Sequence, residues 1–212
     1  INIDLTPKSI ASPPIYNMQR HSNHTPDYIY YAHGKTSSIS VSDIIARDTN
    51  TTKHVLRSLS VNGIPDASII MSKVGYTSDE VTRVLAAAIP LLLKPEATHA
   101  AKIGIGTGLI THTVLTSPVM RTVDTFESEP ENIAGAKLFL PRNELAFQDS
   151  RSNIELGHSG DYFSLALNKY DFVIGGAFEP RIGQHANTLT QEHFQQVKNS
   201  LNSDGLYIQW LN

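Results

Sequence analysis

The stretch Lys102-Ile103-Gly104-Ile105-Gly106-Thr107-Gly108 decides how the rest of the sequence is interpreted. Residues 102–105 are typical of a short strand, and the glycines that follow let the backbone turn sharply into a helix predicted over 109–115. In an open α/β sheet, ligands bind beyond the carboxyl ends of the strands, at turns of this kind. The stretch therefore predicts a ligand site at the first turn of such a sheet.

The spacing of the glycines narrows the class of ligand. The dinucleotide pattern G-x-G-x-x-G needs its last glycine one residue later, where this sequence has Leu109. A pyrophosphate cofactor is therefore disfavoured. The spacing G-x-G-x-G suits S-adenosylmethionine or a relative, which has a nucleoside and an amino-acid tail but no phosphate. The predicted nucleoside-binding residues of the turn are Gly104, Ile105, Gly106, Thr107 and Gly108.

Two acidic residues extend this predicted site. Glu127 ends the second predicted strand, 21 residues after Gly106, where a carboxylate can accept hydrogen bonds from both ribose hydroxyls. Asp161 follows the third strand and is a candidate contact for the adenine amino group. Alternatively, Asp161 caps a helical segment over 162–167, because Asp is a favoured N-cap. The glycines taken alone could form a turn that binds no ligand. The strand before them, the helix after them and Glu127 argue against that alternative.

Outward from the turn, strand and helix patterns alternate, which predicts a parallel, doubly wound sheet. Before the turn, Thr77 and Glu80 have capping-box spacing at the start of a helix that Pro90 is expected to kink or end. The apolar residues that recur on one face of this helix are Val81, Val84, Leu85, Ala88 and Leu92. The other predicted elements are strands over 122–126, 153–156, 170–174 and 206–211, helices over 131–138 and 191–201, and a turn over 202–205.

A small antiparallel unit is predicted before this core. Short runs over 28–31, 37–41 and 55–64 are rich in aromatic and β-branched residues, and Asn62-Gly63 is a preferred two-residue hairpin turn. The predicted organisation is an irregular polar arm over 1–27, a β-hairpin unit over 28–76 and a nucleoside-binding core over 77–212. The predicted fold class is α/β, with a Rossmann-like sheet of the S-adenosylmethionine-dependent methyltransferase type.

Composition argues against several other functions. The chain has 212 residues, no cysteine and a formal net charge of −3, with no Lys/Arg-rich run, so nucleic acid is not an expected partner. The histidines lack His-Glu-x-x-His spacing, and no metal site is expected. The longest apolar run, over 84–93, is too short to cross a bilayer, and no membrane contact is expected from this sequence. Because it begins at Ile1, the sequence is expected to be a piece of a longer protein.

From about Tyr30 to Asn212 the sequence resembles the spermidine synthases, in particular the spermidine-synthase-like domains of longer bacterial proteins. The resemblance rests on the order and spacing of short stretches: YAHGK (31–35), RSLSVNG (57–63), IPLLL (89–93), KIGIGTG (102–108), YDFVI (170–174), EP (179–180) and GLYIQWL (205–211). It implies an N-terminal β-hairpin unit, a Rossmann-like core and a homodimer. It also implies a cytoplasmic location, either alone or as a domain of a larger membrane-associated protein.

The resemblance implies decarboxylated S-adenosylmethionine as aminopropyl donor, putrescine or another polyamine as acceptor, and no tightly bound cofactor. The acceptor side departs from the family pattern. Where the family has Asp-x-x-Asp-Pro after the fourth strand, residues 176–180 read Gly-Ala-Phe-Glu-Pro. Gly176 therefore stands where the amine-deprotonating Asp is expected, and Glu179 is the remaining candidate catalytic base. A Tyr-His-Glu of the family is missing from 78–87, and its Gly-Asp-Gly is Gly-Thr-Gly over 106–108. Few carboxylates remain to offset the desolvation of a cationic diamine.

Three functions stay open at this point. The first is aminopropyl transfer to a polyamine, which the glycine at position 176 places in doubt. The second is S-adenosylmethionine-dependent methyl transfer to a small molecule, which requires a pocket that accepts the donor's carboxylate. The third is a non-catalytic domain that senses a ligand or binds a partner. Decarboxylated S-adenosylmethionine, S-adenosylmethionine and methylthioadenosine are the expected co-substrates or products.

Overall fold

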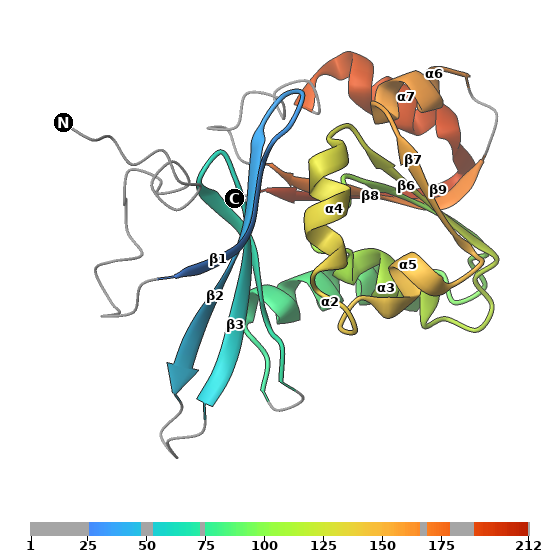
Figure 1. The fold of residues 1–212 in the computed structure, drawn as a ribbon. Coiled ribbons are helices and arrows are strands. Elements are labelled where there is room, and N and C mark those ends of the chain that lie inside the picture. The colour runs from blue at the N-terminus through green and yellow to red at the C-terminus, as the bar shows by residue number, and fades with distance from the viewer. Residues whose placement is uncertain (1–25, 48–52, 73–74, 166–168, 179–188, 212) are drawn as a thin grey trace.

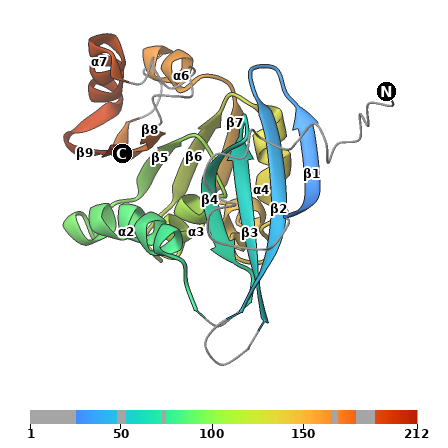
Figure 2. The ribbon, with the colours of Figure 1, turned by 90° about the vertical axis from the view of Figure 1, so that its left-hand side faces the viewer.

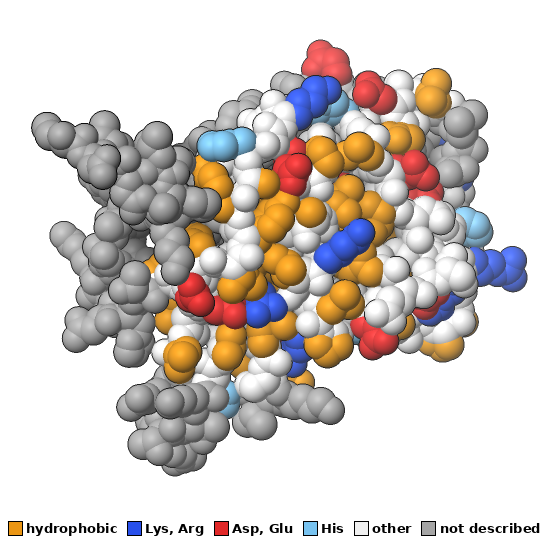
Figure 3. Space-filling view, viewed as in Figure 1, with side chains coloured by type: hydrophobic (Ala, Val, Ile, Leu, Met, Phe, Trp, Pro, Cys, Tyr) orange, Lys and Arg blue, Asp and Glu red, His pale blue; other side chains and the backbone are white. Residues whose placement is uncertain are grey.

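Two β-sheets of different kinds lie next to each other in this chain (Figures 1 and 2). The structure is a computed structural model, and it describes residues 26–47, 53–72, 75–165, 169–178 and 189–211. All of the predicted arm except residues 26 and 27 lies outside the described residues, as does Glu179. Hydrophobic side chains and scattered charges of both signs share the face seen in Figure 3.

The first sheet is antiparallel and has the order β1-β2-β3-β4. Its strands are β1 (Asp27–His33), β2 (Ser38–Arg47), β3 (Lys53–Val61) and β4 (Ile64–Ile70). Asn62 and Gly63 join β3 to β4 with φ angles of 50° and 74°. Positive φ at both positions is what a two-residue hairpin turn requires. The predicted small antiparallel unit and its Asn-Gly turn are therefore confirmed.

Helix α2 (Ser78–Leu93) links this sheet to the core. The Thr77 hydroxyl accepts a hydrogen bond from the Glu80 N–H at 2.9 Å, and the Glu80 carboxylate accepts one from the Thr77 N–H at 3.0 Å, which confirms the capping box. Pro90 does not end the helix, which continues to Leu93. Most of the apolar face predicted for this helix is exposed to solvent, Leu92 by 80%. None of the described helices is long and apolar enough to cross a membrane.

The second sheet is parallel and has the order β7-β6-β5-β8-β9. Its strands are β5 (His99–Ile103), β6 (Thr122–Glu127), β7 (Ser152–Leu156), β8 (Tyr170–Phe178) and β9 (Leu201–Leu211). The strand order reverses at β5 and β8, so the carboxyl ends of these two strands flank the topological switch point. The predicted turn over 202–205 is wrong. The segment belongs to β9, whose pairing shifts from Tyr170 with Leu201 to Phe172 with Leu206, so the extra residues bulge.

Helices cover both faces of the parallel sheet (Figures 1 and 2). Helices α2 and α3 (Leu109–Leu115) pack together on one face, with α5 (Glu144–Gln148) against α3. The other face carries α6 (Ser159–Leu165) and α7 (Gln191–Ser200). Along β5, Ala100 packs on the α3 side and the next residue, Ala101, on the α6 and α7 side. Helix α4 (Pro130–Lys137) contacts β1 and β2, and thereby joins the two sheets.

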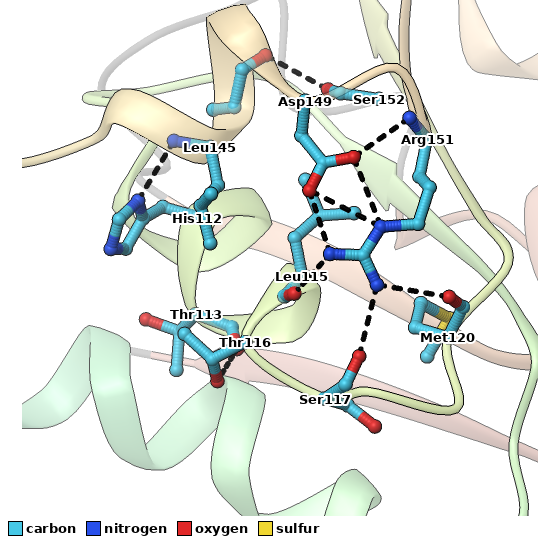
Figure 4. Close-up of polar contacts among 11 residues, drawn as sticks. His112, Thr113, Leu115, Thr116, Ser117, Met120, Leu145, Asp149, Arg151 and Ser152 are labelled. Atoms are coloured by element: carbon cyan, nitrogen blue, oxygen red, sulfur yellow. Dashed lines mark hydrogen bonds and ion pairs between the residues drawn. The ribbon is translucent and has the colours of Figure 1, made fainter.

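The amino ends of β6 and β7 are connected by an arginine (Figure 4). Arg151 pairs with Asp149 at 2.6 Å, and its guanidinium donates to the carbonyl oxygens of Leu115, Ser117 and Met120 at 2.7 to 3.1 Å. The Leu115 carbonyl is in the last turn of α3, where helical partners are lacking. This cluster is at the opposite end of the sheet from the glycine turn.

Candidate functional site

The glycine turn begins directly after β5 and ends at the start of α3. Gly104, Gly106 and Gly108 have φ angles of 73°, 53° and 78°. A side chain at such angles is strained, so the turn needs glycine at these positions. The turn leads into a cavity bounded by the carboxyl ends of β5, β6 and β8 and by the antiparallel sheet. Four of the five predicted turn residues line this cavity: Gly104, Ile105, Gly106 and Thr107.

Glu127 lies directly against the turn, at the end of β6. Its side chain is 5% exposed and accepts hydrogen bonds at 2.9 Å from the N–H groups of Ile105 and Glu129 and from the Asn132 side-chain amide. A carboxylate has about four acceptor positions, so three donors leave one position for a ligand hydroxyl. The structure brings Glu127 and the glycine turn together, as the spacing predicted. Ribose binding by Glu127 stays a prediction.

Three cavity-lining side chains carry buried polar atoms without a hydrogen-bond partner among the described residues. They are Arg83 Nε, Thr107 Oγ1 and Asn132 Oδ1. Leaving such an atom unpaired costs about 1 to 3 kcal/mol. Donors and acceptors are both present in this set, which suits a ligand with several hydroxyl and amino groups.

Asp161 is not brought to the cavity. It is exposed and lies in the first turn of α6, which begins at Ser159. The predicted N-cap role for a helix over 162–167 is therefore wrong, because the helix starts before Asp161. His158 and Ser159 line the cavity instead. The predicted contact between Asp161 and adenine has no support from this geometry.

Four charged residues of the cavity were not predicted from the sequence: Asp66 on β4, Arg83 on α2, Lys102 on β5 and Glu129 at the N-cap of α4. Lys102 is 5% exposed, and its ammonium donates to the carbonyl oxygens of Ile103 and of Gly104, the latter at 2.9 Å. Burial, together with the neighbouring charge of Arg83, lowers the pKa of Lys102 to about 8. Lys102 could have been recognised from the sequence, because a lysine inside an otherwise apolar strand is unusual. Arg83 and Asp66 lie outside the glycine turn and the strand ends, and nothing in the sequence around them indicates a site.

These features define the class of protein: a Rossmann-like α/β protein of the methyltransferase type, preceded by an antiparallel sheet. The sheet is parallel, its strand order reverses next to the glycine turn, and an acidic residue ends the neighbouring strand. The model of the Spermine/spermidine synthase domain matches residues 80–210. The chain belongs to this spermine/spermidine synthase family.

Relatives and solved structures agree with this assignment. The polyamine aminopropyltransferase of Thermotoga petrophila is 26% identical over 148 residues, which are 68% of this chain and 50% of the relative. That of Bacillus mycoides is 24% identical over 124 residues, 58% of this chain and 45% of the relative. The chain thus spans about half the length of these curated relatives.

Among solved structures, a spermidine synthase in complex with the transition-state analogue AdoDATO has a TM-score of 0.69 and 20% identity, covering 85% of this chain and 57% of that one. Spermidine synthase from Thermotoga maritima has a TM-score of 0.67 and 19% identity, with coverage of 85% and 56%. At these identities the structural likeness shows the shared fold.

Proposed function

We propose that the cavity binds the adenosine part of a methionine-derived nucleoside. The observation that carries this proposal is the buried Glu127 carboxylate, whose Oε2 accepts a hydrogen bond from the Ile105 N–H at 2.9 Å. That contact places a carboxylate beside the glycine turn, where no side chains cover the backbone, at the topological switch point of the sheet. The unpaired polar atoms of Thr107 and Asn132 add further hydrogen-bonding capacity for a ribose or a base.

We further propose that the chain contributes to alkyl transfer from a sulfonium donor. In such a transfer the nucleophile's lone pair attacks the carbon next to sulfur. The carbon–sulfur bond breaks, sulfur leaves with the electron pair as a neutral thioether, and the nucleophile releases a proton. The protein's part is to hold the two reactants in line and to exclude water. The name of the relatives, polyamine aminopropyltransferase, makes aminopropyl transfer to a polyamine the first candidate, with decarboxylated S-adenosylmethionine as the donor that the family resemblance implies. A homodimer stays a prediction.

The released proton needs an acceptor. Gly176 lines the cavity and supplies none, so Glu179, outside the described residues, stays the candidate base.

A second candidate reaction is methyl transfer from S-adenosylmethionine. It is favoured by the two cationic side chains of the cavity, Arg83 and Lys102, because they suit a donor that keeps its carboxylate.

Calorimetry with methylthioadenosine tests the nucleoside site, because this thioether lacks the carboxylate that distinguishes the two donors and the amino group that they share. Saturable binding with one site per chain is expected, with guanosine as a non-binding control. Absence of binding contradicts the proposed function. A turnover assay with putrescine and decarboxylated donor then tests aminopropyl transfer, which requires product above background and its loss in Glu179→Ala.

A further inference from the structure

Lys102 brings an amine to the carboxyl end of β5, inside the cavity. The residue is 5% exposed and lines the cavity beside the glycine turn. Its Nζ donates hydrogen bonds to two backbone carbonyl oxygens, that of Ile103 and, at 2.9 Å, that of Gly104. An ammonium has three N–H donors, so one of them has no partner within the part of the chain that the structure describes.

The number of these partners bears on the protonation of the amine. A neutral amine keeps two N–H donors and gains a lone pair, so Lys102 can lose a proton and still donate to both carbonyl oxygens. Burial lowers its pKa, Arg83 on α2 lowers it further, and Asp66 on β4 and Glu127 on β6 raise it. The resulting pKa of about 8 leaves about one Lys102 in ten neutral at pH 7.

The space in front of Gly176 is open. A Cβ built on Gly176 is 3.2 Å from the Ile103 carbonyl oxygen, and no other described atom except those of its chain neighbours lies within 4 Å of it. The family resemblance puts the amine-deprotonating Asp at this position. Lys102 donates to that same carbonyl oxygen, so its amine lies close to the place of the missing carboxylate. A nucleophile in this space is near a group that can take its proton.

The three carboxylates that line the cavity make other contacts. Glu127 accepts three N–H groups at the glycine turn and at the start of α4. Glu129 accepts the backbone N–H groups of residues 35–37. Asp66 faces Arg83 at 3.7 Å. None of these carboxylates lies within 4 Å of the Cβ position at Gly176, so the neighbouring amine is the better placed group.

We infer that Lys102 accepts the proton of the nucleophile in the proposed alkyl transfer, in place of a carboxylate at position 176. The lone pair of the nucleophile forms the bond to carbon, the carbon–sulfur bond breaks, and sulfur leaves with that electron pair. The neutral Lys102 amine takes the proton that the nucleophile releases, becomes an ammonium and then passes the proton to water. This inference rests on the proposed function, because the same cavity must bind the donor.

A reagent directed to the cavity tests the position and the protonation of this amine without turnover. Adenosine with a fluorosulfonylbenzoyl group on its 5′ oxygen is attacked by neutral amines, which form a sulfonamide and release fluoride and a proton. We expect mass spectrometry of the intact chain's digest to find the label mainly on Lys102, at a rate that rises with pH around a midpoint near 8. Methylthioadenosine at about ten times its Kd should slow this labelling about 10-fold. The exposed Lys137 is the internal control and should not be protected.

Arginine at position 102 tests the role in proton transfer. Lys102→Arg keeps the positive charge and N–H donors for both carbonyl oxygens, but a guanidinium cannot lose its proton. With putrescine and decarboxylated S-adenosylmethionine, the variant should lower kcat about 100-fold or more, while methylthioadenosine affinity changes less than about threefold. Lys137→Arg is the matched control and should be as active as the wild-type chain. If Lys102→Arg does not fold, Lys102→Met replaces it with the same expected loss of kcat.

The possible failures give different results. Absence of methylthioadenosine binding in the wild-type chain refutes the proposed function itself. With that binding intact, a Lys102 that is not labelled, or whose labelling methylthioadenosine does not slow, overturns the inference because the amine does not face the cavity. Unchanged kcat in Lys102→Arg overturns it in favour of Glu179. A wild-type chain that binds methylthioadenosine and is labelled at Lys102 but forms no product also overturns the catalytic role.

Discussion

The buried carboxylate of Glu127 has a structural role and a proposed ligand-binding role. Three donors from the turn and from α4 hold it in place, and its position beside the turn makes it available to a ligand. A buried, hydrogen-bonded acid with a spare acceptor position is a suitable group for ribose hydroxyls. The cost of removing its charge should therefore appear in ligand affinity as well as in the stability of the fold.

We predict that Glu127→Gln weakens methylthioadenosine binding by about 1 to 3 kcal/mol, because a hydroxyl donor loses its charged acceptor. Glutamine keeps one oxygen for the protein's own N–H groups and turns an NH2 group toward the others, so the free energy of unfolding is expected to fall by about 1 to 3 kcal/mol as well, and affinity is measured on the folded protein. Glu155→Gln, at an exposed position on the neighbouring strand β7, is the control and should bind like the wild-type chain. Equal affinities for wild type and Glu127→Gln would remove Glu127 from the site.

The sequence predicted the part of the site that depends on local backbone. Gly106 and Glu127 follow consecutive strands, and the carboxyl ends of parallel strands meet at one edge of a sheet. Arg83 and Asp66 enter the cavity from α2 and β4, and their approach depends on how the two sheets pack. The predicted capping role of Asp161 was wrong, because α6 begins two residues before it. Tertiary packing, not local pattern, decides how Arg83 and Asp66 reach the cavity.

At the scale of the elements, the alternation of strands and helices predicted the parallel sheet. Each element that differs from the prediction has a physical reason. Asn202–Gly205 has a turn composition, yet it is accommodated as a bulge in β9. The α2 helix continues past Pro90, because tertiary context overrides the propensity of a single residue. The short helix α5 had no periodic signal, since five residues are too few to show one.

We predict that Arg151→Ala lowers the free energy of unfolding by about 2 to 4 kcal/mol, because it leaves Asp149 and three carbonyl oxygens without their shared donor. The pKa of Asp149 should also rise from about 2 toward its ordinary value, since hydrogen bonds from Arg151 depress it. Urea denaturation measures the first effect. The exposed Arg121→Ala is the control, and a loss as small as that of Arg121→Ala would show that the cluster contributes little.

For the molecule as a whole, Glu129 connects the two sheets. This acid sits at the N-cap of α4 and accepts hydrogen bonds from residues 35–37, in the loop between β1 and β2. Gly34 is needed there, because a Cβ at that position would come within 2.1 Å of the Glu129 carboxylate. The cavity is lined from both sheets, so its shape depends on this connection.

We predict that Glu129→Gln destabilises the protein by roughly 1 to 3 kcal/mol at pH 7. Burial raises the pKa of Glu129, but hydrogen bonds from Thr36 and Lys35 outweigh it and hold the pKa below its ordinary value. A carboxyl with a lowered pKa in the folded state stabilises above its unfolded pKa, and that stabilisation is lost as pH falls through the folded pKa. The difference between wild type and Glu129→Gln should therefore shrink below about pH 4.5. Exposed Glu96→Gln is the control, and a difference that does not vary with pH contradicts this role.

A crystal structure of the chain with methylthioadenosine tests the proposed nucleoside site most directly. We predict that the nucleoside lies over Gly104 to Thr107, with a ribose hydroxyl within about 3.2 Å of a Glu127 oxygen. A nucleoside bound elsewhere, or a Glu127 carboxylate that still contacts only protein N–H groups in the complex, would contradict it.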